Sequence, residues 1–249
     1  MDTNKLDFPT EEVELPSQGV LYPEDNPLSS GKVEIKYMTA KEEDILTNQN
    51  YIEKGTVLDK LLESLIVSDI NYKDLFIGDK NALLIAARIL GYGKDYEFEY
   101  KGEKVTADLT QIENKPLKSE MFKQGQNEFS YTLPVTSTPI TFKFLTHKDE
   151  TKIDQELKGL KKINKNSSPD FSTRLKHMIL SVNGENDQNT IRKFVDTNFL
   201  AQDSRAFRKH LKDIQPDVDM TVSIETSDGG QEDVELPIGI NFFWPDAEV

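Results

Sequence analysis

Apolar and charged residues alternate over residues 33–37, and this spacing of two predicts a β-strand with one face toward water. Immediately after it, Thr39 and Glu42 stand three residues apart, in the capping-box pattern that starts a helix. We expect this helix to end near Leu46. A strand that leads directly into a capped helix is therefore the first feature that the pattern predicts.

Two longer helices are predicted next, by apolar residues at intervals of three and four. Residues 57–66 place their apolar side chains on one face and their charged side chains on the other, so this helix is amphipathic. Over residues 80–90 the apolar side chains cover almost the whole circumference, which indicates a buried central helix. We expect Asp79 to cap its start and Gly91 to end it.

The spacing of two returns in four runs that pair as two hairpins, 96–100 with 105–109 and 129–133 with 140–144. One antiparallel sheet could contain all four runs. No internal repeat of fixed period is visible, which argues against solenoids and propellers.

The last third of the chain alternates between helical and strand patterns. Four short helices are predicted around residues 153–160, 171–179, 191–195 and 207–214. Asp203 and Ser204 are natural caps for the last of them. Residues 218–224 and 234–238 then form a hairpin pattern around Asp228, Gly229 and Gly230.

Together these elements predict an α+β fold in three parts. The first is an extended N-terminal arm over residues 1–30, which is rich in Pro, Asp, Glu and Ser. The second is an α+β domain over residues 31–147 with the buried helix and the antiparallel hairpins. The third is a block of short helices with a C-terminal β-hairpin over residues 148–249.

Composition narrows the classes of partner. The chain has 249 residues with 44 acidic and 30 basic side chains, and its formal net charge is −14. A field of this sign repels phosphate groups, so we expect no nucleic-acid partner. No run approaches the roughly 20 apolar residues that span a bilayer, so we expect no membrane span. Residues 1–14 are acidic where a signal peptide is basic, which predicts that the protein stays in the cytoplasm where it is made.

Residues that could carry chemistry are scattered. The chain has no cysteine, and its three histidines, His147, His177 and His210, lie on different predicted elements without a metal-ligand spacing. The acidic runs at 11–12 and 42–44 are better explained by solvent exposure and by the helix dipole than by catalysis. We therefore predict no catalytic residue, no metal and no cofactor.

Clustered apolar residues near both ends predict a protein interface instead. Three consecutive aromatic residues close the chain, so that in a strand at least one faces away from the core, although they could also pack inside the terminal hairpin. The N-terminal arm has the same two alternatives, since an extended segment can add a strand to another subunit. The residues of this predicted interface are Leu15, Leu21, Tyr22, Phe242, Phe243 and Trp244.

Three segments in succession, residues 15–23 (LPSQGVLYP), 39–46 (TAKEEDIL) and 77–80 (IGDK), resemble the N-terminal half of the T-even-type phage baseplate hub subunit family. Their order and their spacing both fit. None of the motifs is a catalytic fingerprint, and the specificity lies in their succession. The resemblance extends over the whole chain, through residues 95–109, 182–184, 203–205 and 242–245.

The chain departs from this family at one hairpin. Relatives often carry a Cys-x-x-Cys pair in the hairpin that here spans residues 98–104, and such a pair suggests a zinc knuckle. This chain lacks both thiolates. A metal role is therefore not carried over, and we expect Tyr and Phe packing to hold the hairpin.

The resemblance implies a structural subunit, not an enzyme, that acts through protein–protein contacts in the baseplate hub of a contractile phage tail. Its partners would be other baseplate hub and tail proteins, and an oligomer within the assembly is compatible with this role. The implied location is the virion tail baseplate, with the host cytoplasm during assembly. One alternative is a non-virion assembly chaperone for the hub. A second is a cytoplasmic enzyme that uses the acidic clusters.

Overall fold

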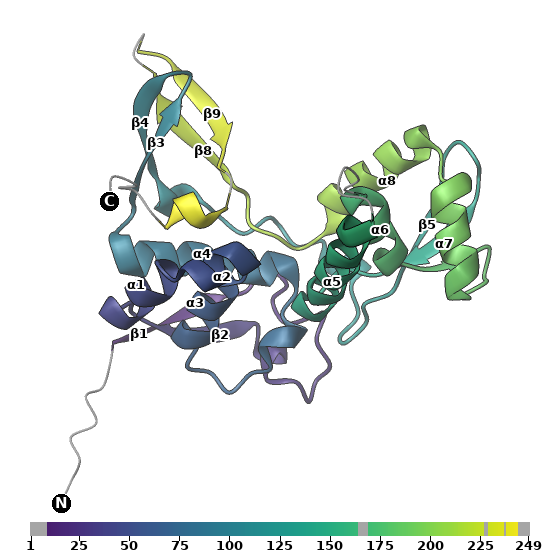
Figure 1. Ribbon diagram of the computed structural model, residues 1–249, viewed down its shortest axis with the longest axis horizontal. Coiled ribbons are helices and arrows are strands. Elements are labelled where there is room, and N and C mark those ends of the chain that lie inside the picture. The colour runs from purple at the N-terminus through teal and green to yellow at the C-terminus, as the bar shows by residue number, and fades with distance from the viewer. Residues whose placement is uncertain (1–8, 164–168, 227–228, 237, 244–249) are drawn as a thin grey trace, which may run out of the picture.

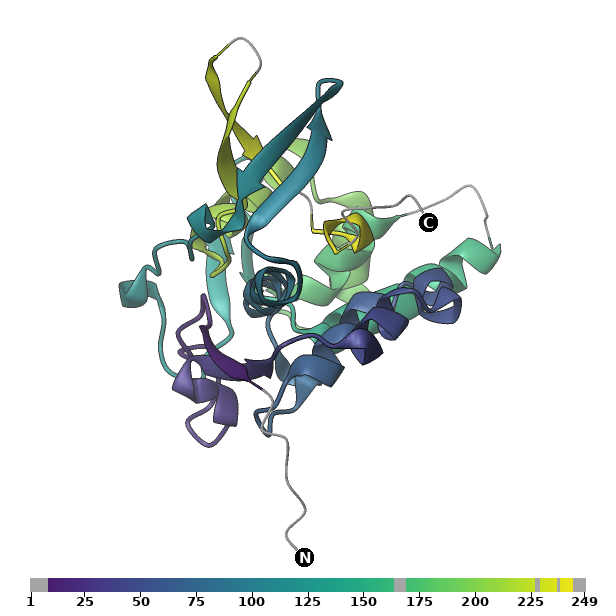
Figure 2. The same cartoon turned by 90° about the vertical axis from the view of Figure 1, so that its left-hand side faces the viewer.

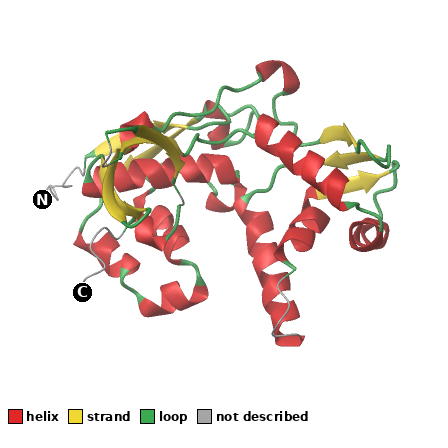
Figure 3. Ribbon diagram, turned by 90° about the horizontal axis from the view of Figure 1, so that it is seen from above, coloured by secondary structure: helices red, strands yellow, loops and turns green. Residues whose placement is uncertain are grey.

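The computed structural model describes residues 9–163, 169–226, 229–236 and 238–243, and in them the chain has the predicted α+β fold (Figure 1). Helices combine with several small antiparallel sheets. Seen from above, a three-stranded sheet lies at one end of the molecule and two hairpins lie toward the other (Figure 3).

The first half of the chain is a two-stranded sheet followed by helices. Its elements are β1 (Thr10–Glu14), β2 (Lys32–Lys36), α1 (Ala40–Leu46), α2 (Gln49–Lys54), α3 (Val57–Leu65) and α4 (Ile77–Tyr92). β1 and β2 are antiparallel, and β2 leads into the capped helix α1 as predicted. Leu83, Leu84 and Ala87 are buried, which confirms that α4 is a buried central helix. The helix continues past Gly91, which was predicted to end it, and Gly93 is its C-cap residue.

The second half is a three-stranded sheet surrounded by helices. Its elements are β5 (Phe129–Thr132), β6 (Pro139–Phe142), α5 (His147–Ile163), α6 (Asp170–Met178), β7 (Ile179–Val182), α7 (Gln188–Thr197) and α8 (Ala201–Ile214). The helices confirm the predicted helical block. β7 was not predicted, and it forms because residues 179–182 pair with the edge of β6 that β5 leaves open.

Each half ends in a β-hairpin. The first hairpin is β3 (Asp95–Tyr100) with β4 (Glu103–Asp108), and the second is β8 (Thr221–Glu225) with β9 (Gln231–Glu235). Both were predicted. The suggestion that β3 and β4 share a sheet with β5 and β6 is wrong, because β5 and β6 pair with β7 in a separate sheet.

The two halves share one succession of elements, namely two antiparallel strands, a capped helix, further helices and a hairpin, with β7 as an additional strand between the helices of the second half. The sequence correspondence is closest where the second strand leads into the capped helix. Residues 36–43 read KYMTAKEE, and residues 143–150 read KFLTHKDE. Segments of unequal length separate the other corresponding elements, so the sequence shows no fixed period.

Four helices carry a buried carboxylate at their third residue. These residues are Glu42 in α1, Asp79 in α4, Asp149 in α5 and Asp203 in α8. A negative charge there is stabilised by the helix dipole and the unpaired backbone N–H groups. Glu42 accepts a hydrogen bond of 3.0 Å from the N–H of Thr39, which confirms the predicted capping box. Asp149 accepts one of 3.2 Å from the N–H of Thr146.

The carboxylate of Asp79 does not cap α4, contrary to prediction. Phe76 is the N-cap residue, and Asp79 faces the loop that follows β1. There it accepts hydrogen bonds from the N–H and the hydroxyl of Ser17, at 2.9 and 2.7 Å, and from the hydroxyl of Tyr22 at 2.6 Å. Asp79 thereby fixes an irregular loop on the central helix.

Asp203 and Ser204 also lie inside the first turn of a helix and do not cap α8 as predicted. Leu200 is the N-cap residue. The carboxylate of Asp203 accepts hydrogen bonds from the N–H groups of Val135 and Thr136, at 2.7 and 3.1 Å. These residues follow β5, so Asp203 holds the loop after the first strand of its half, as Asp79 does in the other half.

The hairpin of the second half packs on the first half (Figure 2). β8 lies beside β4, and residues 216–219 run back along α4. Asn81 donates a hydrogen bond of 3.0 Å to Asp217, and the approach is so close that a Cβ on Gly78 would lie 2.0 Å from the carbonyl oxygen of Pro216. The two halves therefore share one hydrophobic core.

The two predicted domain boundaries, after residues 30 and 147, both lie in structured parts of the chain. The boundary after residue 147 lies in the first turn of α5. Residues 10–30 form β1, a turn and the 3₁₀ turn Pro27–Ser30, and they pack on the first half.

Candidate functional site

A polar cleft of about 640 Å³ lies where the two halves meet. The first half contributes residues of α3 and α4, among them Asp59 and Lys80. The second half contributes residues of α5 and α6, among them His147, Glu150 and Arg174. Acidic, basic and imidazole side chains thus meet across the junction.

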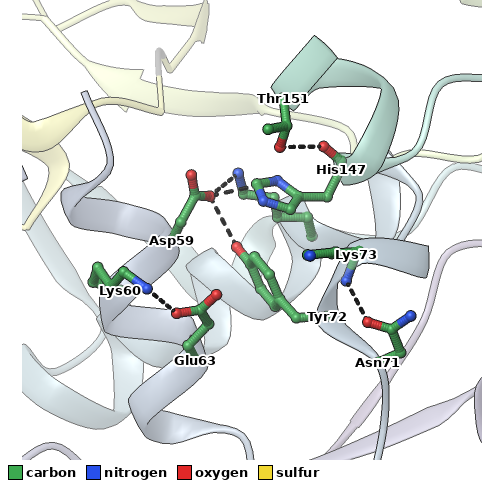
Figure 4. A network of polar contacts seen from close by, with 9 residues as sticks. Asp59, Lys60, Glu63, Asn71, Tyr72, Lys73, His147 and Thr151 are labelled. Atoms are coloured by element: carbon green, nitrogen blue, oxygen red, sulfur yellow. Dashed lines mark hydrogen bonds and ion pairs between the residues drawn. The ribbon is translucent and has the colours of Figure 1, made fainter. Parts of the chain in front are cut away.

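Asp59 is the centre of a network of polar contacts in the lining of the cleft (Figure 4). It accepts a hydrogen bond of 2.9 Å from the hydroxyl of Tyr72 and another from the ammonium group of Lys80. Nδ1 of His147 lies 3.7 Å from the same carboxylate oxygen. The rings of His147 and Tyr72 are in contact, with their centroids 4.6 Å apart. One carboxylate therefore joins α3, α4 and the 3₁₀ turn Tyr72–Asp74 and faces the start of α5.

Burial shifts the pKa values of Tyr72 and His147, the two titratable side chains in contact beside Asp59. It raises the pKa of the Tyr72 phenol well above its ordinary value of 10, and the nearby Asp59 carboxylate adds to this. Burial also lowers the pKa of His147 below 6.5, although Asp59 opposes the change. At neutral pH the imidazole is therefore uncharged, and its buried Nδ1 has no hydrogen-bond partner among the described residues.

Two further pairs of opposite charge line the cleft. Lys60 pairs with Glu63 at 2.6 Å, and Arg174 pairs with Glu150. The contact of Arg174 with Glu150 links α6 to α5, whereas Lys60 and Glu63 both lie on α3. No group of three potential metal-ligating His, Cys, Asp or Glu residues occurs in the part of the chain that the structure describes.

The three histidines do not converge. His177 contacts Glu156 through Nε2 at 2.9 Å, on the face that α5 shares with α6. His210 stacks on the ring of Tyr131, with centroids 4.4 Å apart. Only His147 lies in the polar cleft among these three.

The N-terminal residues of the predicted interface lie inside the protein's own core. Leu15, Leu21 and Tyr22 are each 3% exposed or less. The loop after β1 folds back on α4, and the contact of Tyr22 with Asp79 holds it there. These side chains are therefore not an exposed docking patch in this structure.

The C-terminal residues of the predicted interface are buried as well. Phe242 and Phe243 are both 1% exposed, and Trp244 lies outside the described residues. The prediction of an exposed aromatic residue assumed a strand, in which consecutive side chains face opposite sides. In the structure, residues 240–242 form a 3₁₀ turn instead. Phe242 packs on Tyr96, and the N–H of Arg88 Nε donates a hydrogen bond of 2.9 Å to the carbonyl oxygen of Phe242.

Sequence reasoning missed the polar network around Asp59. Asp59 belongs to the charged face of an amphipathic helix, and neither Tyr72 nor Lys80 stands in a motif with it. The residues meet only because α3, α4 and α5 pack together. No local spacing in the sequence could have indicated the arrangement.

Comparison with known proteins adds no relative, because no family model, curated protein or solved structure matches the chain. Among the described residues no helix has both the length and the apolar character needed to cross a membrane.

Proposed function

We propose that this chain is a non-enzymatic subunit of the baseplate hub of a contractile phage tail and that it acts through protein–protein contacts. The proposal starts from the resemblance of residues 15–23, 39–46 and 77–80 to the T-even-type hub subunit family. One structural observation supports it most. Ser17 and Tyr22 of the first segment bind Asp79 of the third in the interior of the protein.

The segments that carry the resemblance thus contribute to the scaffold. Glu42, in the second segment, is also buried, and it accepts a hydrogen bond from Ser64 of α3 at 2.7 Å. By contrast, Asp59, Tyr72 and His147 of the polar cleft lie outside all three segments, although Lys80, which donates to Asp59, belongs to the third. The resemblance therefore reports a shared scaffold and includes no catalytic motif, which is compatible with a role in assembly.

The charge of the chain supports proteins as partners. With a net charge of −14, the molecule repels nucleic acid and attracts basic surfaces. We expect these surfaces to belong to other baseplate hub and tail proteins.

The test is to express the chain with the tail proteins encoded beside it and to analyse purified baseplates by mass spectrometry. A hub subunit is expected at a fixed ratio to the other hub proteins in the finished particle. Presence in assembly intermediates alone would instead identify an assembly chaperone. Absence from both would reject the proposal.

One variant tests whether the polar cleft is needed for assembly. His147→Ala removes the imidazole of the polar cleft, and Ala40 occupies the corresponding position in the first half. We expect this variant to enter baseplates at the normal level. If it folds normally and assembly nevertheless fails, the cleft itself takes part in assembly, and the assignment of the hub role to the scaffold alone is wrong.

A further inference from the structure

An apolar groove of about 560 Å³ lies between the two hairpins, apart from the polar cleft. Tyr96 and Phe242 are buried in it, and Phe98, Tyr100 and Val234 are half-buried. Phe98 stacks on Tyr96, with the ring centroids 5.5 Å apart. A groove with several partly exposed aromatic and aliphatic side chains is typical of a binding surface.

Two strands border this groove, and each of them pairs with one other strand only among the described residues. In the described residues β3 pairs only with β4, and β9 pairs only with β8. β4 and β8 lie beside each other, and in the described residues no strand pairs with the second edge of β3 or of β9. An outer strand presents backbone N–H and C=O groups that an added strand can pair with.

Most outward-facing side chains of both strands are acidic. Glu97 and Glu99 on β3, and Asp233 and Glu235 on β9, are exposed, and neither strand contains a basic residue. Glu99 and Glu235 line the groove itself. Three basic side chains lie near the groove: Lys104 is the cross-strand neighbour of Glu99 on β4, Arg88 lies under the floor and binds the carbonyl oxygen of Phe242, and Lys101 at the far end is paired with Glu232 at 2.7 Å. The groove therefore combines an apolar floor with a negatively charged rim.

We propose that this groove binds an extended segment of a partner protein in which apolar and basic residues alternate. The strand edges select an extended backbone, the floor selects apolar side chains at every second position, and the rim selects basic side chains between them. The inference deepens the proposed function and rests on it in one respect, since the segment is expected to belong to another tail protein.

The chain's own sequence does not fit this requirement. Residues 244–249 follow the groove directly, but they contain Asp246 and Glu248, which the acidic rim repels, and Pro245, which lacks the N–H needed for pairing. A second copy of the chain is also disfavoured, because it carries the same net charge of −14.

Binding is tested with the full chain and a labelled ten-residue peptide, KVKFKVKFKV, by fluorescence anisotropy at low salt. The control peptide has glutamate in place of each lysine and should bind at least about tenfold more weakly, a difference of about 1.4 kcal/mol. Hydrogen exchange of the unmodified chain should slow on peptide addition at residues 96–100 and 231–235. No binding of the basic peptide, or slower exchange only elsewhere, would overturn the proposal.

Variants locate the contact. Glu99→Lys with Glu235→Lys reverses the charge of the rim and should weaken peptide binding about tenfold. The matched control, Glu120→Lys with Glu128→Lys, changes the net charge equally at exposed positions outside the groove and should alter the affinity less than about twofold. Equal weakening by both pairs would indicate attraction by the overall charge and would overturn the proposal.

Two further measurements address the other occupants. If deletion of residues 244–249 strengthens peptide binding more than about tenfold, the chain's own end fills the groove, and the partner proposal is wrong. Dimerisation that rises with concentration and disappears in the Glu99→Lys, Glu235→Lys variant would identify a second copy and would also contradict it. Each result assigns the groove to one occupant.

The proposal for the groove and the proposal for the hub role can be rejected independently of each other. Peptide binding by a chain that never enters baseplates would reject the hub role and retain the groove. Normal entry of the Glu99→Lys, Glu235→Lys variant into baseplates, with peptide binding lost, would reject the groove as the hub contact and retain the hub role.

Discussion

The hydroxyl of Tyr22 donates a hydrogen bond of 2.6 Å to Asp79, which lies 57 residues further along the chain. The same hydroxyl accepts one of 3.1 Å from the N–H of Phe76, just before α4. Burial and the neighbouring carboxylate raise the pKa of Tyr22 well above its ordinary value of 10, so the hydroxyl keeps its proton and remains a donor. A single phenol thus connects an irregular loop to the start of the central helix.

Replacing the acceptor of this contact should destabilise the whole chain. Asp79→Ala leaves the N–H of Ser17 and the hydroxyl of Tyr22 buried without their partner. Because unsatisfied buried donors are costly, we expect a loss of about 3 kcal/mol in the free energy of unfolding, measured with urea. The exposed residue Asp44 provides the control, since Asp44→Ala should change stability by less than about 0.5 kcal/mol. Equal effects of the two changes would contradict this role for Asp79.

Two helical glycines should respond in opposite ways to alanine. At Gly78 a Cβ would overlap the carbonyl oxygen of Pro216 at 2.0 Å, so Gly78→Ala should cost about 2 kcal/mol despite the better helix propensity of alanine. At Gly159, inside α5, a Cβ meets nothing within 4 Å. Gly159→Ala should therefore raise stability by up to about 1 kcal/mol. Thermal unfolding of both variants tests the close approach, and stabilisation by Gly78→Ala would refute it.

The pairing of Glu156 should make stability depend on pH. Both terminal guanidinium nitrogens of Arg192 donate to Glu156, at 2.6 and 2.9 Å. Arg192, assisted by His177 and opposed by partial burial, lowers the pKa of Glu156 from 4.5 to about 2. The unfolded chain regains the ordinary value of 4.5. The paired carboxylate therefore stabilises the fold above pH 4.5, and this contribution is lost as the pH falls through 2.

Glu156→Gln should remove this contribution. One pKa unit is worth about 1.4 kcal/mol, and allowing for partial exposure we expect a loss of roughly 2 kcal/mol at pH 6. At pH 3 the difference between variant and parent should shrink to less than half, as followed by urea unfolding at both pH values. Glu120→Gln, at an exposed position, is the control and should show no such change. A difference that is the same at pH 3 and pH 6 would show that the effect is not one of charge.

The imidazole of His147 should titrate below pH 6.5, because burial lowers its pKa. Asp59 opposes that shift, so Asp59→Asn should lower the pKa of His147 further, as followed by NMR titration of the ring protons. Asp154→Asn is the matched control, since this exposed carboxylate also lines the cleft. An increase in the pKa of His147 on loss of Asp59 would contradict the electrostatic account of the cleft.

Features decided by neighbouring residues could be predicted from the sequence. The capping box of Thr39 and Glu42 depends on residues three apart, and the hairpin of β3 and β4 depends on a two-residue turn at Lys101 and Gly102. Lys101 and Gly102 both have positive φ values, of 51° and 84°, which suit such a turn. Local chemistry is sufficient for elements of this kind.

Features decided by packing could not be predicted. Residues 179–182 continue a helical pattern, and only the open edge of β6 makes them a strand. Asp79 has the sequence signature of a cap, but its acceptor role depends on a loop more than 50 residues away. The burial of Phe242 likewise depends on Arg88 and Tyr96 of the first half. In each case the partner lies too far along the chain for a local pattern to reveal it.

The contacts of Phe242 also affect when the protein can fold during synthesis. The guanidinium group of Arg88 is buried beside the carbonyl group of Phe242, and the ring of Tyr96 packs on that residue. A ribosome releases the first half long before residue 242 emerges. Until then the guanidinium group of Arg88 in the central helix lacks one of its hydrogen-bond acceptors. The ring of Tyr96 on β3 likewise lacks the aromatic side chain that packs on it. Products of premature termination should therefore remain accessible to proteases, so that only chains synthesised through Phe243 accumulate.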